Sequence, residues 1–274
     1  MLTLTPTCSA SPLETEHFFK TSDRVRLHYK NVGQGERVLV FIPGWLMPAD
    51  VFRHQWCDLG QDHRVIVLDP RGQGLSQAPV KDLSAARRAR DILELQQHLK
   101  LKRYVLIGWS LGVMEVLEAM TKHPMPGLQG LVLIDNSIGM GIPAASDGTR
   151  RQRPMGREPF ARYAKEFSRA IFKRPPEEDL LQAVERSAKL LPPPLAWRLL
   201  DKPHPRQYYR QAVIAATVPL WYAITPRYSD QAEELLRSRP GAAVTVFDDA
   251  GHALFVDSAP AFNIGLRQFL HRLP

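Results

Sequence analysis

Short apolar segments alternate along most of the chain with longer segments whose apolar residues recur at helical spacing. A short run rich in Val, Ile and Leu is typical of a strand buried on both faces, and the longer spacing is typical of an amphipathic helix. Such an alternation predicts a mostly parallel sheet covered by helices on both faces. Strands are predicted at 37–42, 64–68, 104–107, 130–135, 219–225 and 243–247, and helices at 51–59, 83–99, 113–120, 231–237 and 259–270. An antiparallel hairpin is predicted ahead of them, over 17–29.

One proline-rich stretch interrupts this alternation, between the strand ending near Asp135 and the strand starting near Pro219. The polar residues 139–156, rich in Gly, Pro and Arg, predict a mobile loop at its start. Helices are predicted in the rest of it at 160–172, 177–190 and 206–216, separated by prolines at 175–176, 192–194, 203 and 205. We therefore divide the chain into a core, 1–137 and 218–274, and an insert, 138–217.

The composition is that of an ordinary globular chain, and it excludes several classes of protein. With 274 residues, 44% hydrophobic and 23% charged, the chain is long enough for one large domain or a core with an insert. No apolar run reaches the ~18 residues of a membrane span, and the N-terminus lacks the pattern of a secretory signal. Two cysteines, Cys8 and Cys57, are too few for a disulfide framework and lack metal-ligand spacing. We therefore predict a cytoplasmic location and no membrane partner.

The positive charge belongs almost entirely to the insert. Residues 139–217 hold 15 Lys/Arg and 8 Asp/Glu, which gives +7 of the formal net charge of +8. No basic helix with interleaved aromatic residues is present, so we predict no nucleic-acid partner. A solvated surface explains the charge, and so does attraction of an anionic substrate or an acidic partner. The arginines expected to act in the second way are Arg150, Arg151, Arg153 and Arg157.

The motif Gly108-Trp109-Ser110-Leu111-Gly112 joins a predicted strand to a predicted helix. This is G-x-S-x-G in the strand–turn–helix context of a nucleophile elbow, which holds the serine hydroxyl above the sheet on a strained turn. The two glycines let the strand and the helix pass closely. The amide of Leu111 would open the helix and point at a developing oxyanion. The motif therefore predicts Ser110 as a nucleophile.

With these residues the chain resembles the α/β-hydrolase family over nearly its whole length apart from the insert. It is similar to small microbial serine esterases of that family, including carboxylesterases and cofactor-free haloperoxidases. The resemblance implies the α/β-hydrolase fold, the insert 138–217 as a helical lid over the active site, and no metal or organic cofactor. Residues 69–76, DPRGQGLS, are similar to the family's D-x-R-G-x-G-x-S loop, in which Asp69 and Arg71 are interpreted as structural.

A serine hydroxyl is a weak nucleophile and needs a base to take its proton. His252 follows the strand predicted at 243–247 in the sequence GHALF, and the segment PAFN follows at 260–263. That arrangement matches the histidine loop of the family, and the chain order, serine first and histidine last, fits as well. His252 is therefore the predicted base.

The acid that would orient the histidine has two candidates. The family usually carries it in a G-x-x-D turn after the penultimate strand, but here Thr225 and Tyr228 stand at the glycine and acid positions. Asp230 comes two residues later, and its D-x-x-E spacing to Glu233 also fits a helix capping box. Some family members carry the acid after the strand that follows the nucleophile strand, which is Asp135 here. We favour Asp135 and keep Asp230 as the alternative.

The resemblance also implies an oxyanion hole. The family has H-G-x after its third strand, and this chain has Pro43-Gly44-Trp45. The two backbone donors would be the amides of Trp45 and Leu111. The side chains of Trp45 and Trp109 are candidates for lining the substrate pocket.

The favoured function is a serine hydrolase that cleaves a small carboxylic ester through an acyl-enzyme, with a Ser-His-Asp triad of Ser110, His252 and Asp135. Hydrolysis of a C–C bond and peracid chemistry use the same triad and stay open. The alternative from another class is a non-catalytic ligand-binding protein on a hydrolase scaffold. The displaced acid and the missing family histidine support this alternative. The sequence leaves the acyl group and the oligomeric state undetermined.

Overall fold

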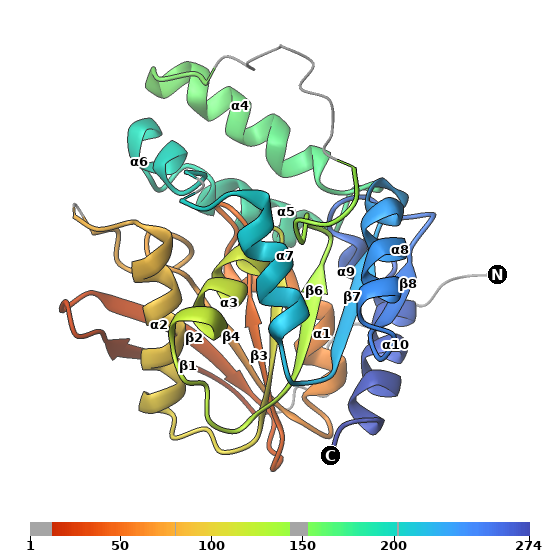
Figure 1. Cartoon of the computed structure of the whole chain (residues 1–274). Helices are drawn as coiled ribbons and strands as arrows, with labels where there is room; N and C mark the ends of the chain where they lie inside the picture. Colours follow the sequence, from red (N-terminus) through yellow and green to blue (C-terminus); the bar gives the residue numbers. More distant parts are fainter. Residues whose placement is uncertain (1–12, 80, 143–152, 202) are drawn as a thin grey trace.

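The computed structural model describes residues 13–79, 81–142, 153–201 and 203–274. Within these ranges the chain folds around one central sheet, with a group of helices above one edge of it (Figure 1). Cys8, Arg150, Arg151 and residues 143–152 of the predicted loop lie outside the described ranges.

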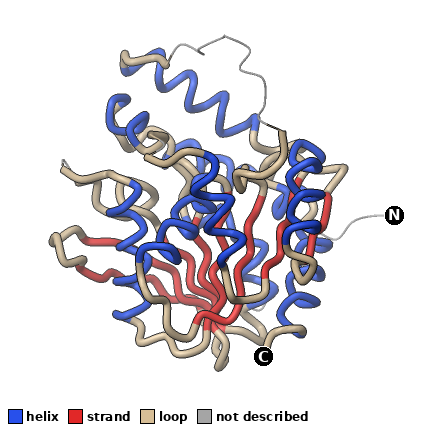
Figure 2. The backbone as a smooth tube through the Cα atoms, in the orientation of Figure 1, coloured by secondary structure: helices blue, strands red, loops and turns tan. Residues whose placement is uncertain are grey.

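The sheet has eight strands in the order β1-β2-β4-β3-β5-β6-β7-β8. Figure 2 shows the strands in red, with helices on both sides of them. β1 pairs antiparallel with β2, and β2 with β4, whereas the pairs from β4 to β8 are parallel. The predicted mostly parallel sheet and opening hairpin are thereby confirmed. The strands are β1 (Glu14–Lys20), β2 (Arg26–Val32), β3 (Val38–Ile42), β4 (Arg64–Leu68), β5 (Tyr104–Trp109), β6 (Leu128–Ile134), β7 (Leu220–Ile224) and β8 (Ala243–Val246).

Helices cover both faces of the sheet because its central strands are apolar on both sides. In β5, Tyr104 and Leu106 join one apolar cluster, while Val105 and Ile107 join the other. The first cluster is completed by α2 (Ala85–His98), α3 (Leu111–Lys122) and α8 (Ser229–Ser238). The second is completed by α1 (Arg53–Leu59), α9 (Leu254–Asp257) and α10 (Ala259–His271). Two short 3-10 turns lie at Ala49–Phe52 and Pro226–Tyr228.

The insert between β6 and β7 contributes to two different parts of the molecule. Its last helix, α7 (Arg206–Ala215), packs on α3 through residues of the first core cluster. Its α5 (Glu178–Ser187) joins the second cluster. Only α4 (Arg157–Ala170) and α6 (Pro193–Arg198) stand clear of the sheet, above the carboxyl ends of its strands (Figure 1). Between them and the core lies a third apolar cluster, which includes Trp45, Leu111 and Trp197.

The helix α6 differs from the sequence prediction, which treated the prolines at 192–194 as a break. In the structure Pro192 is the N-cap residue, and Pro193 and Pro194 occupy the first turn of the helix. A proline in the first helical turn loses no intrahelical hydrogen bond, and its fixed φ suits the helix. The prolines therefore begin this helix.

No helix in the described parts of the chain is long and apolar enough to cross a lipid bilayer.

Candidate active site

Ser110 lies at the turn from β5 into α3, with a φ of 54° that few residues other than glycine adopt. The neighbouring backbone makes this turn possible only with glycine on both sides. A Cβ on Gly108 would lie 2.5 Å from the carbonyl oxygen of Gly112, and a Cβ on Gly112 would lie 2.3 Å from that of Ile42. The strained turn lifts the serine side chain to the carboxyl edge of the sheet, as the motif predicts.

His252 lies between Ser110 and Asp135. Its Nε2 is 2.8 Å from Oγ of Ser110, and its Nδ1 is 2.7 Å from Oδ2 of Asp135. When Nδ1 carries the proton and donates it to the carboxylate, Nε2 is left as an acceptor for the serine hydroxyl. Side chains from the ends of β5 and β6 and from the loop after β8 therefore meet in the geometry that general-base activation of a serine requires.

Asp135 is fixed by its own backbone and by the neighbouring strand. It directly follows β6 with a φ of 44°, and its amide donates to the carbonyl of Ala223 at 2.9 Å. Its Oδ1 accepts two hydrogen bonds of 2.7 Å, from the amide and from Oγ1 of Thr225. Oδ2 is thus left to face His252. Thr225, which the sequence marked only as a departure from the family glycine, is the residue that holds this carboxylate.

Asp230, the alternative acid, does not contact His252. Its Oδ2 accepts a hydrogen bond of 2.9 Å from the amide of Ile142. The predicted capping box is also wrong, because the N-cap residue of α8 is Tyr228 and no side chain caps that helix. Asp230 lies inside the first turn, two residues after the N-cap position. The carboxylate instead ties α8 to the start of the insert.

The histidine loop is fastened on both sides of His252. Asp257 accepts from the amide of Gly251 at 2.8 Å, and the amide of Ala253 donates to the carbonyl of Ile171 at 2.8 Å. The indole Nε1 of Trp109 donates to the carbonyl of His252 at 2.9 Å, and the two rings lie 5.3 Å apart. The imidazole position is therefore set by the loop itself, by the insert and by the nucleophile strand.

The loop after β3 passes close to Ser110, as an oxyanion hole needs. A Cβ on Gly44 would lie 2.9 Å from Cβ of Ser110, so the main chain entering Trp45 runs directly beside the nucleophile. The next amide, of Leu46, donates to Oε1 of Gln73 and fixes the loop. On the other side Leu111 is the first residue of α3, where an amide has no intrahelical acceptor.

A cavity of about 160 Å³ opens beside Ser110, between α2, α3 and the insert. Residues that line it include Arg88, Ser110, Leu111, Met114, Glu115 and Tyr209. Neither Trp45 nor Trp109 belongs to this lining. Trp109 is packed in the core behind His252, and the indole of Trp45 stacks on Trp197 at 5.0 Å and donates to the carbonyl of Ala196. The sequence prediction that both line the pocket therefore does not hold for this cavity, because both rings are engaged elsewhere.

Two features of the cavity were missed from the sequence. Asn136 donates a hydrogen bond of 2.6 Å from Nδ2 to the carbonyl of Ser110, which stabilises the turn at the serine. Arg88 and Glu115 form a buried ion pair in the cavity wall, with 2.5 Å between Nε and Oε1. Burial raises the pKa of the Glu115 carboxyl, and the charge of Arg88 opposes that rise. A glutamate within the largely apolar helix 111–122 is the signal that could have drawn attention to it.

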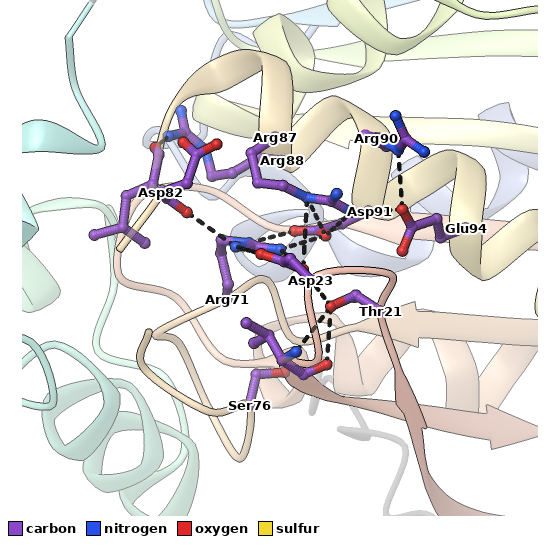
Figure 3. A network of polar contacts seen from close by, with 12 residues as sticks. Thr21, Asp23, Arg71, Ser76, Asp82, Arg87, Arg88, Arg90, Asp91 and Glu94 are labelled. Carbon is purple, nitrogen blue, oxygen red and sulfur yellow. Dashed lines mark hydrogen bonds and ion pairs between the residues drawn. The ribbon is translucent and has the colours of Figure 1, made fainter. Parts of the chain in front are cut away.

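Asp69 and Arg71 have the structural roles expected of them. Asp69 accepts from the amides of Ala49 and Leu75, which shapes the loop after β4. Arg71 lies between the carboxylates of Asp23 and Asp91 (Figure 3). Arg88, which is drawn with this network, also lines the cavity beside Ser110.

Two of the four insert arginines, Arg153 and Arg157, lie within the described ranges. Arg153 stands over the ring of Trp197 at 5.4 Å and lies 3.9 Å from Asp201. Across the ranges that the structure describes, no three His, Cys, Asp or Glu side chains gather as a metal site would require.

Comparison with known proteins agrees with this fold. Residues 39–263 match the family model described as the alpha/beta hydrolase family. The chain therefore belongs to the alpha/beta hydrolase family, as the resemblance in its sequence implied.

Three particular proteins illustrate the similarity. The chain is 36% identical to the human serine hydrolase BPHL over 105 residues, which is 36% of this chain and 36% of that protein. It is 28% identical to N-formylmaleamate deformylase of Pseudomonas putida over 265 residues, which is 91% of this chain and 94% of that protein. The esterase RhEst1 from Rhodococcus superposes with a TM-score of 0.78 at 18% identity, covering 94% of this chain and 99% of that chain, and so shares the fold.

Proposed function

We propose that the protein is a serine hydrolase that cleaves a small carboxylic ester through an acyl-enzyme intermediate. The observation that carries this proposal is the continuous series of contacts from Asp135 through His252 to Ser110, with hydrogen-bond distances of 2.7 and 2.8 Å. A serine at a strained turn, a base in contact with it and an acid behind the base are the parts that acyl transfer needs.

The proposed reaction has two halves. In the first, Oγ of Ser110 attacks the ester carbonyl carbon while Nε2 of His252 takes the hydroxyl proton, and that proton then goes to the departing alkoxide. In the second, His252 takes a proton from water, the resulting hydroxide attacks the acyl carbon, and Ser110 regains its proton as the acid leaves. Asp135 keeps the imidazole in the tautomer with the proton on Nδ1 and stabilises the imidazolium. The amides of Trp45 and Leu111 would stabilise the tetrahedral oxyanion.

The insert 138–217 is proposed to act as the lid over this site. The supporting observation is that α4 and α6 share an apolar cluster with Trp45 and Leu111, the two residues assigned to the oxyanion hole. A cover of this kind excludes water and limits the size of the substrate. A small-molecule ester is therefore the proposed substrate.

One observation favours a second candidate, hydrolysis of a C–N bond. The relative matched over 91% of the chain is a deformylase named for an N-formyl substrate. The proposed triad could attack a formyl or acyl amide by the same steps, with His252 giving its proton to the departing nitrogen. Relative rates on a matched ester and amide would separate the two.

Labelling with a fluorophosphonate probe tests the proposal directly. Wild-type protein should be labelled, and Ser110→Ala should lose both the label and hydrolysis of p-nitrophenyl acetate, with an unchanged circular dichroism spectrum. His252→Ala should label at least ~10²-fold more slowly, because the base is then lost. Folded wild-type protein that neither reacts with the probe nor hydrolyses the ester would contradict the proposal and favour a ligand-binding protein.

A further inference from the structure

The cavity beside Ser110 has a charged wall that the proposed reaction does not use. Arg88 on α2 is 3% exposed and Glu115 on α3 is 2% exposed, and both line the cavity. The guanidinium Nε of Arg88 donates to Oε1 of Glu115 at 2.5 Å. Buried charges of this kind are costly to keep unless every group finds a partner.

Each guanidinium nitrogen of Arg88 donates a hydrogen bond within the protein. Besides Nε, its first terminal nitrogen donates to the carbonyl of Leu83, and its second donates to the carbonyl of Leu199 at 3.0 Å. All three guanidinium nitrogens are thus engaged, and Arg88 joins α2 to α3 and to the end of α6. Three of its five N–H groups are therefore used within the protein.

Glu115 is different, because only one of its carboxylate oxygens is used. Among the described residues none donates a hydrogen bond to Oε2. An ionised carboxylate can accept about four hydrogen bonds, and the burial that raises the pKa of Glu115 makes a further donor favourable. Among the residues that the structure describes, this acceptor in the cavity wall therefore has no donor.

The distance from Ser110 to this acceptor suits the length of an acyl chain. Glu115 follows Ser110 by five residues on α3, which is about 7.5 Å along the helix axis. Both residues line the same cavity, so a bound chain can extend from one to the other. Between them the wall is formed by Leu111, Met114 and Leu200, which suit methylene groups.

We propose that this cavity binds a substrate with an acyl chain of about six carbons whose far end carries a neutral hydrogen-bond donor, a hydroxyl or an amide N–H, that Glu115 accepts. The ion pair is neutral overall, so a buried substrate group with a net charge would gain little there. A terminal carboxylate would meet the Glu115 carboxylate while Arg88 is engaged. The inference rests on the proposed serine hydrolase and goes beyond it by naming the substrate class.

Three matched ethyl esters test the inference on the wild-type enzyme in a pH-stat. Ethyl heptanoate ends in a methyl group where ethyl 6-hydroxyhexanoate has a hydroxyl, and monoethyl adipate ends in a carboxylate. We expect kcat/KM for the hydroxy ester to exceed that for heptanoate by about tenfold, the value of one hydrogen bond to a charged acceptor, and adipate to be the poorest. Equal rates for the first two, or a preference for adipate, would overturn the inference and leave the serine hydrolase in place.

A pair of variants on the same helix sharpens the test. In Glu115→Gln the hydroxy-to-methyl preference should fall to about twofold or less, because the acceptor loses its charge. Glu118→Gln, one turn away, equally buried and not part of the cavity lining, should keep the wild-type preference. A preference that survives in Glu115→Gln would overturn the inference. If none of the esters reacts, labelling of Ser110 decides: a labelled serine means that the substrate class is wrong, and an unlabelled one means that the proposed function itself fails.

Discussion

The loop after β4 and the loops after β5 and β6 both carry buried polar side chains. The two regions differ in how completely these side chains are paired with other groups of the protein. In the first, the Arg71 guanidinium is 0% exposed and is held by Asp91 on α2 and by Asp23 (Figure 3). Although burial opposes ionisation, hydrogen bonds from Arg71 and Thr21 lower the pKa of Asp23 to about 2. Each charge in this network has an opposite charge beside it.

In the loops after β5 and β6, some polar groups stay open to solvent or to the cavity, and the main chain is strained. His252 keeps 28% of its side chain exposed, and Ser110 opens into the cavity. The backbone φ is positive at Ser110 and at Asp135, in a region that costs roughly 1–3 kcal/mol for a residue other than glycine. Such strain persists only where the surrounding structure enforces it, here through Gly108, Gly112 and Thr225.

This difference in pairing distinguishes the Arg71 network, which stabilises the fold, from the contacts between Ser110, His252 and Asp135, which can react with a substrate. Charges that are fully paired join elements of the fold, since nothing is left to act on a ligand. Groups that are partly satisfied, strained and open to a cavity are those that can exchange protons and bonds with a substrate. Substitutions in the two regions should therefore affect different measurements.

The largest effect is expected from Asp135→Asn. The substitution preserves the shape of the side chain but presents an amide to Nδ1 of His252, which favours the wrong tautomer for proton transfer. We expect kcat to fall about 10³–10⁴-fold with little change in the melting temperature, measured by ester hydrolysis and by calorimetry. Asp230→Asn is the matched control and should stay within about twofold of wild type. Equal losses in the two variants would contradict the assignment of Asp135 as the acid.

Arg71→Met is the corresponding test of the structural network. It leaves the nearly buried Asp91 with Arg87 as its remaining cationic partner. We expect the free energy of unfolding in urea to fall by about 3 kcal/mol, while kcat of the folded enzyme changes less than about threefold. Arg90→Met removes an exposed pair with Glu94 on the same helix and should cost no more than about 0.5 kcal/mol. A loss of kcat without a loss of stability in Arg71→Met would mean that the two regions are coupled.

The fold could be predicted from the sequence because its signals are local. Short apolar runs predicted the six strands from β3 to β8 to within two residues, and the predicted strand 64–68 has the bounds of β4. The opening hairpin, predicted over 17–29, extends three residues further at each end. The elbow was equally accessible, since strand, glycines, serine and helix are contiguous. The prediction of a proline break was wrong at α6, because proline, which interrupts a helix, is also favoured in its first turn.

The rest of the site depends on contacts between distant segments, which local patterns do not contain. Thr225 reaches Asp135 because β6 and β7 are neighbours in the sheet, although 90 residues separate the two side chains in sequence. Asp230 carried a plausible local motif, but its amide partner comes from the insert. Trp109 faces the core because of how α9 and the histidine loop pack behind β5. The order of the strands and the packing of distant segments determine the contacts of all three residues.

The smallest effect, and the most specific, is expected at Thr225. Thr225→Val keeps the β-branched shape and the amide that donates to Asp135, and removes only the hydroxyl donor to Oδ1. A less firmly held carboxylate should lower kcat about tenfold and leave KM unchanged, because the substrate itself does not touch this residue. Thr225→Ser restores the donor and should recover most of the activity. Thr121→Val, which removes a hydroxyl bonded to the carbonyl of Leu117, is the control for general loss of a hydrogen bond and should not change kcat. Should Thr225→Ser be as impaired as Thr225→Val, the packing of the side chain rather than its hydroxyl would be what orients Asp135.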